Sequence, residues 1–210
     1  MSKEYGYITG KEIEQAFRDN KGIFTPQDII ELDQENKWTN FGQLEFIETI
    51  TLSSVSSANF NNLGTFNTHL MTLNNIQNTT DNGRPILRYI ENGVVESAGN
   101  YQFANFQLDS TGSSAESKNS GSTSALLCIN NGSGTNEKSN AYTIIYNAID
   151  STKFTYNTVH SSGIIGSSNP FKMWYGSCVL EQRTSVTGFN ISVSSGTLTG
   201  QISLYGLRFS

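Results

Sequence analysis

The sequence predicts a mainly β protein: a jelly-roll-like antiparallel β-sandwich preceded by a short two-helix N-terminal arm. Three observations support this fold class. After Gly42, apolar residues recur at every second position, which is typical of half-buried strands. Asn-Gly pairs and other turn-forming residues separate these runs at short intervals. Before Gly42 the apolar spacing is helical, so the chain divides into an arm, residues 1–42, and a sandwich domain, residues 43–210.

The first helix of the arm is predicted to begin at Thr9. Thr9 and Glu12 have the spacing of a capping box, in which each side chain satisfies a free backbone N–H of the other residue. Three apolar residues then follow at helical spacing: Ile13, Ala16 and Phe17. The helix ends near Gly22, where the sequence reads Asn-Lys-Gly.

A second helix starts at Thr25 as N-cap, with Pro26 in the first helical position, where a missing N–H costs nothing. It ends near Asn36. Two helices of about ten residues are marginal alone, so their apolar side chains need another surface. That surface is either the chain's own sandwich or another protein. We predict that an apolar set carries the attachment: Ile13, Phe17, Phe24, Ile29, Ile30, Leu32 and Trp38.

Ten strands are predicted in the sandwich domain: 44–52, 66–76, 85–91, 101–108, 124–130, 141–149, 154–160, 172–181, 187–194 and 201–209. Tight turns are predicted where Asn-Gly pairs tolerate positive φ: Asp81-Asn82-Gly83, Asn92-Gly93 and Asn131-Gly132. Short strands without helices between them indicate a two-sheet sandwich.

Two segments of this domain support more specific predictions. Residues 186–210 read as two alternating strands joined by a Ser-Ser-Gly turn, which predicts a terminal hairpin. Residues 110–124 have almost no apolar side chain to bury, which predicts a long, mobile surface loop.

The charge pattern bears on partners. The net charge is −5, and residues 1–48 hold ten acidic and five basic side chains, whereas residues 49–210 hold eight of each. Without a basic stripe, nucleic-acid binding is not expected.

No run approaches the roughly 18 apolar residues of a membrane-spanning helix. The polar start MSKEYGYITGKE contains no signal-peptide core, so synthesis in a cytoplasm is expected.

The two cysteines, Cys128 and Cys178, each lie in an apolar strand without a second cysteine at metal-ligand spacing. Buried free thiols are favoured over a disulfide or a metal site.

Catalytic motifs are sparse. His69 and His160 lie in or beside predicted strands without the further ligands that a zinc site needs. There is no Gly-x-Ser-x-Gly elbow, no phosphate-binding glycine loop and no His-Glu-x-x-His. Most carboxylates of the sandwich follow turns, although two could still meet across a cleft as glycoside hydrolysis requires. We therefore predict no enzymatic activity, no metal and no cofactor, with an acidic-site hydrolase as an alternative.

Aromatic residues provide the one candidate binding surface, Phe171, Trp174 and Tyr175 in NPFKMWYG, with a second cluster in NYQFANF. Adjacent residues of a strand point to opposite faces, so one of Trp174 and Tyr175 faces outward. An exposed ring there can pack under a loop, contact a neighbouring subunit or stack on a sugar.

Several segments resemble a family of β-sandwich virion structural proteins of tailed, marine-type bacteriophages. They are FNTHLMTLNNIQ, DNGRPILRYIENG, NYQFANFQL and the ending VTGFNISVSSGTLTGQISLYGL, together with GIFTP and a following Trp in the arm. The resemblance implies a non-enzymatic virion protein made in the host bacterial cytoplasm. The arm would dock a capsid decoration or head-associated sandwich on other virion proteins. The alternative is a tail appendage or receptor-binding protein that recognises host surface carbohydrate.

The sandwich is also predicted to form a homo-oligomer. Balanced charges give little repulsion between copies, and the last strand stays apolar almost to its end. By analogy with phage appendages the number is three, around Ile202, Leu204, Leu207 and Phe209 or around the strand from Phe171 to Tyr175.

Overall fold

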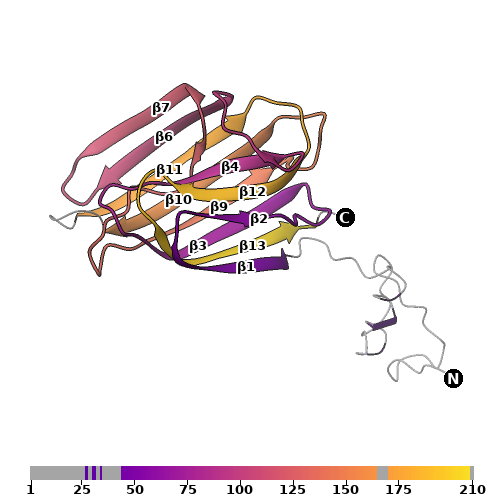
Figure 1. Ribbon diagram of the computed structural model, residues 1–210, viewed down its shortest axis with the longest axis horizontal. Helices are drawn as coiled ribbons and strands as arrows, with labels where there is room; N and C mark the ends of the chain where they lie inside the picture. The colour runs from indigo at the N-terminus through magenta and orange to yellow at the C-terminus, as the bar shows by residue number, and fades with distance from the viewer. Residues whose placement is uncertain (1–26, 28–29, 32–33, 35–43, 165–169, 209–210) are drawn as a thin grey trace, which may run out of the picture. The chain divides into compact units, whose positions relative to one another are not determined.

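The computed structural model describes residue 27, residues 30–31, residue 34, residues 44–164 and residues 170–208. Its strands are β1 Leu44–Val55, β2 Ser57–Phe60, β3 Thr68–Asn78, β4 Pro85–Glu91, β5 Val94–Val95, β6 Tyr101–Asp109, β7 Ser114–Ser122, β8 Ala125–Leu126, β9 Ser139–Tyr146, β10 Thr155–Ile164, β11 Phe171–Leu180, β12 Val186–Val193 and β13 Leu198–Leu207 (Figure 1). Gln27, Ile30, Glu31 and Gln34 are helical. The rest of the predicted two-helix arm lies outside the described residues.

The strands form two antiparallel sheets, as predicted for a mainly β sandwich. The larger sheet has the order β1-β13-β3-β9-β10-β11-β6-β7, and the smaller has the order β2-β12-β4-β5, with β8 also paired to β4. Figure 1 shows β2, β12 and β4 lying together and β6 and β7 at the far end of the larger sheet. All of these strands belong to one compact unit, residues 44–207.

The hydrophobic core lies between the sheets, because inward-facing side chains from both sheets form one buried cluster. Alternation along β10 illustrates this, since Asn157 and Val159 are buried whereas Tyr156 and Thr158 are exposed. The largest fully buried side chains include Trp174, Tyr89, Tyr101, Phe60 and Phe189. The Tyr89 ring stacks on Tyr101 with centroids 5.9 Å apart.

The predicted C-terminal hairpin is wrong. β12 lies between β2 and β4 in the smaller sheet, whereas β13 lies between β1 and β3 in the larger one. Alternating apolar residues are common to hairpin strands and to strands that face each other across a core, so the pattern did not separate the two arrangements. The turn crosses between the sheets at Gly196, where φ is +81° and a Cβ would lie 2.5 Å from the Asn78 side-chain oxygen.

The position of β13 also corrects the predicted oligomer contact at the C-terminal strand. Ile202 and Leu204 are fully buried in the core, so they cannot contact another subunit. Leu207 pairs with Leu44 of β1, and Phe209 lies outside the described residues. The last strand is therefore an interior strand and not a bare sheet edge.

The predicted loop over residues 110–124 is wrong in its centre, where β7 pairs antiparallel with β6. Within the described residues, β7 is the last strand of its sheet. A strand at an edge is held by backbone hydrogen bonds to one neighbour and leaves most of its side chains in solvent, so it needs few apolar residues. The composition of this segment therefore predicted correctly that its side chains are exposed, but not that its backbone forms a strand.

Two of the predicted tight turns differ in outcome. Asn92 and Gly93 join β4 to β5 with φ of 51° and 78°, as their sequence predicts. Asn131-Gly132 is not such a turn, since neither residue has positive φ. Asn131 is buried, and its backbone N–H donates to the Gly83 carbonyl at 2.8 Å.

Both cysteines are free and buried, as predicted. Burial raises the pKa of Cys128 to about 11 and that of Cys178 to about 12. Because the thiolate is the reactive form, we expect slow alkylation of both residues in the native protein and complete alkylation in denaturant without reductant. Mass spectrometry of the labelled peptides checks this, and a linked Cys128–Cys178 peptide would contradict it.

Candidate functional site

The outer face of the larger sheet exposes an unusual number of large apolar side chains. Those more than one-third exposed are Leu44, Phe46, Leu108, Tyr142, Tyr146, Tyr156, Phe171 and Tyr175. The strand period places them there, because their sequence neighbours on β9, β10 and β11, such as Thr143, Asn157 and Trp174, face the core. We call this surface the aromatic face. Large exposed apolar side chains that gather on one face mark candidate interaction sites.

Four rings on the aromatic face lie in one line across four neighbouring strands. Tyr142 on β9 is directly opposite His160 on β10, which is opposite Tyr175 on β11, which is opposite Phe106 on β6. The ring centroids of Tyr142 and His160 are 5.6 Å apart, and those of Phe106 and Tyr175 are 5.9 Å apart. We call these four residues the aromatic row.

A hollow runs beside the aromatic row. Its floor includes Ala104 and Ser177, two small residues paired across β6 and β11, and larger side chains such as Tyr156 and Lys118 surround it. Its volume is about 750 Å³. A second hollow of about 350 Å³ lies next to Phe106, Glu116 and Tyr175. Small residues between rows of large ones therefore make a groove over β11, β6 and β7.

The groove carries balanced charge. Glu116 and Lys118 form an ion pair at 3.3 Å, with side chains 68% and 78% exposed. An ion pair this exposed contributes little to stability, about 1 kcal/mol at most. Polar groups near the pair include Gln102, Asn119, Ser120 and Ser177. The surface thus combines flat rings with neutral hydrogen-bonding groups.

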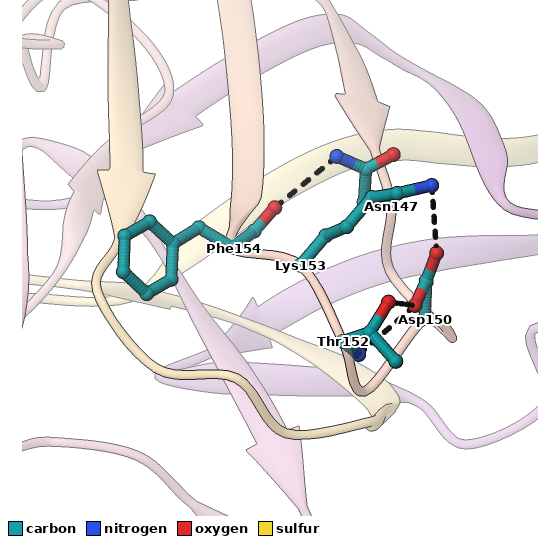
Figure 2. Close-up of polar contacts among 5 residues, drawn as sticks. All are labelled: Asn147, Asp150, Thr152, Lys153 and Phe154. Atoms are coloured by element: carbon teal, nitrogen blue, oxygen red, sulfur yellow. Dashed lines mark hydrogen bonds and ion pairs between the residues drawn. The ribbon is translucent and has the colours of Figure 1, made fainter.

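The connection between β9 and β10, two strands of the aromatic row, is closed by polar contacts among its own residues (Figure 2). Asn147 has φ of 60° and its side-chain amide donates to the Phe154 carbonyl at 3.2 Å. The Asp150 carboxylate accepts from the Thr152 hydroxyl at 2.6 Å and backbone N–H at 2.9 Å, and pairs with Lys153 at 2.9 Å. These hydrogen bonds, chiefly that from Thr152, lower the pKa of Asp150 to about 2. The loop is a local scaffold for Tyr146 and Tyr156, which are paired directly across it.

The predicted aromatic surface residues divide between the two faces of β11. Phe171 and Tyr175 are 52% and 44% exposed and lie on the aromatic face. Trp174 is only 1% exposed, so its inclusion in the predicted surface is corrected: the alternation of β11 turns it into the core. Of the predicted attachment residues, Ile30 is described and is 48% exposed, and the others lie outside the described residues.

The tyrosines at positions 142, 146 and 156 were missed by sequence reasoning as site residues. Their signal was present, because each occupies a solvent-facing position in an alternating strand where a polar residue is usual. Neither strand indicates by itself that the tyrosines of β9 and β10 would become neighbours.

The two histidines do not form a pair. His69 is buried in β3, where its Nε2 lies 2.8 Å from the Leu63 carbonyl and its ring packs edge-on against Phe66 and Phe189. Among the residues that the structure describes, its Nδ1 has no hydrogen-bond partner. Desolvation lowers the pKa of His69, with the Leu63 hydrogen bond acting in the opposite direction. His160 instead lies in the aromatic row.

No protein-family model, no curated protein and no solved structure matches this chain. Within the part of the chain that the structure describes, no three His, Cys, Asp or Glu side chains gather as a metal site. The same described residues include no helix with the length and apolar character needed to span a membrane.

Proposed function

We propose that this chain is a non-enzymatic structural protein of a bacteriophage virion, in a capsid decoration or head-associated position. Residues 1–42 attach it to other virion proteins, and the sandwich is displayed. The segments that resemble virion proteins now lie in identifiable strands: FNTHLMTLNNIQ contributes β3, NYQFANFQL contributes β6, and the ending contributes β12 and β13.

The observation that carries this proposal is the strand order, which supports a jelly roll. Eight strands in chain order, β1, β2, β3, β4, β8, β9, β12 and β13, form two four-stranded sets, β1-β13-β3-β9 and β2-β12-β4-β8. This interleaving of first and last strands is the two-Greek-key arrangement of jelly rolls, an architecture used by viral capsid domains. The remaining strands extend the larger sheet by β10, β11, β6 and β7.

Removal of the arm tests the proposal. A chain that starts at Gly42 should retain the β circular dichroism of the full chain, because the core lies within residues 44–207. It should fail to enter particles when it replaces the full chain during phage assembly. Copy number is measured by quantitative mass spectrometry of purified virions, and imaging of the particle locates the full chain. Incorporation of the truncated chain at the normal copy number would refute attachment by the arm.

The aromatic row favours a second candidate function, recognition of host surface carbohydrate by a tail appendage. The ring centroids are 5.6 Å apart in the Tyr142–His160 pair and 5.9 Å apart in the Phe106–Tyr175 pair, so the row offers an extended line of aromatic surface across neighbouring strands. The C–H faces of sugars pack on such rings, while hydroxyls bond to neighbouring groups such as Gln102 and Ser177.

A glycan array probed with the purified full chain tests this candidate. Tyr142→Ala and Tyr175→Ala should each weaken binding about tenfold without loss of stability. The matched control is Val94→Ala, since Val94 is 68% exposed but lies on β5 of the other sheet. Absence of binding by the full chain would eliminate carbohydrate recognition and leave the structural role untouched.

A further inference from the structure

The outer edge of β7 has the properties of a pairing surface. β7 pairs with β6 on one side, and in the described residues no strand covers its other side (Figure 1). It is nine residues long and contains no proline. A strand of this length leaves a row of N–H and C=O groups available to an additional strand.

The hydrogen-bond pattern between β6 and β7 identifies which residues of β7 direct their backbone N–H and C=O groups to the open edge. Asp109 of β6 donates its backbone N–H to the Ser113 carbonyl at 3.0 Å, and the register continues without a shift from Leu108↔Ser114 to Phe103↔Asn119. Antiparallel strands direct alternate residues to opposite neighbours. The groups that point to the free edge are therefore those of Ser114, Glu116 and Lys118.

The same residues carry the charge of the strand. Glu116 and Lys118 are its two charged residues, and both side chains are strongly exposed. They lie on the outer face, since Glu116 is opposite Phe106 and Lys118 is opposite Ala104. One acidic and one basic residue, two positions apart, make this edge complementary to itself when a second copy runs antiparallel.

We propose that β7 pairs antiparallel with β7 of a second copy of this chain, with the twofold axis at Ser117. In this register Glu116 of each copy is opposite Lys118 of the other, and each such pair exchanges two backbone hydrogen bonds because both residues face the edge. A twofold axis at Glu116 or at Lys118 would place like charges opposite each other. The charges therefore select one register.

This pairing joins the two larger sheets into one continuous sheet. The grooves of the two copies become neighbours across the axis, because Glu116 and Lys118 also border the hollows beside the aromatic row. The inference stands apart from the proposed virion role, since it rests on the edge geometry alone.

Charge reversal tests the pairing in the full chain. Wild-type protein should sediment as a dimer of the 23.1 kDa chain. Glu116→Lys and Lys118→Glu should each raise the dimer dissociation constant about tenfold or more, because each places like charges opposite each other twice. An equimolar mixture of the two variants should recover the dimer, since the mixed pair restores both opposite-charge contacts. Glu181→Lys and Lys138→Glu are the matched controls, because these exposed residues lie outside β7 and make the same charge changes.

Hydrogen exchange of the wild-type protein gives a second readout that does not depend on the variants. Pairing predicts that the amides of Glu116 and Lys118 become as protected as those of Ala115 and Ser117, with protection that increases with protein concentration. A monomer throughout the micromolar range, or a dimer that survives both reversals, would overturn the proposal. Concentration-independent protection would also overturn it, because it would assign the edge to a segment of the same chain.

Discussion

Replacing Trp174 by alanine is expected to remove much of the stability of the sandwich. Trp174 is the largest of the fully buried side chains and belongs to the single core cluster between the sheets. Truncating a buried Trp to Ala costs about 3–5 kcal/mol, whereas the free energy of unfolding of a typical domain is about 5–15 kcal/mol. Urea unfolding followed by intrinsic fluorescence or circular dichroism measures the change.

The adjacent residue provides the control. Tyr175→Ala removes a large ring from the next position of the same strand, but that ring is 44% exposed on the aromatic face. We expect the free energy of unfolding to change by about 0.5 kcal/mol or less. Equal losses for the two variants would mean that the assignment of the faces of β11 is wrong.

Acidification is expected to destabilise the protein through His69. The pKa of His69 is lowered from 6.5 by burial, so below pH 6.5 the unfolded chain binds a proton that the folded chain does not. Above pH 6.5 this site does not change the free energy of unfolding. As the pH falls from 6.5 towards the lowered pKa of the folded state, the free energy of unfolding decreases. The slope of this single site is at most about 1.4 kcal/mol for each pH unit.

His69→Gln separates this effect from general acid denaturation. Glutamine keeps an N–H donor for the Leu63 carbonyl but does not titrate in this range. The variant should therefore lose part of the dependence of unfolding midpoint on pH between 6.5 and 5, measured by urea titration at each pH. His160→Gln, on the outer face, is the control. If His69→Gln and wild type show parallel pH profiles, His69 does not control the acid response.

Strand positions were largely predictable because alternation is a local property. The predicted strand at 85–91 coincides with β4, and that at 172–181 differs from β11 by one residue at each end. Which strands pair with each other was not predictable from the same alternation. β12 and β13 read as one hairpin, yet each is an interior strand of a different sheet, because burial on one face does not specify which strand lies alongside.

The candidate site followed the same rule. That one of Trp174 and Tyr175 faces outward was predicted, because adjacent residues of a strand face opposite ways, but only the structure shows that it is Tyr175. The aromatic row was not predicted, since it arises only when β9, β10, β11 and β6 pair in one register, and β6 is far from the others in sequence. Similarly, β7 owes its conformation to backbone groups of β6 and not to its own side chains.

The interior place of β13 has a consequence for biosynthesis. β13 is made after every other strand, yet β1 and β3 have no partner for their facing edges until it inserts between them. The Thr49 and Ser203 hydroxyls, 2.7 Å apart, join positions separated by 154 residues. Such non-local pairing slows folding, and on the ribosome the facing edges of β1 and β3 keep unpaired N–H and C=O groups until β13 has been made. Ribosome stalling before residue 198 should therefore yield a chaperone-bound, aggregation-prone chain and not a smaller folded domain.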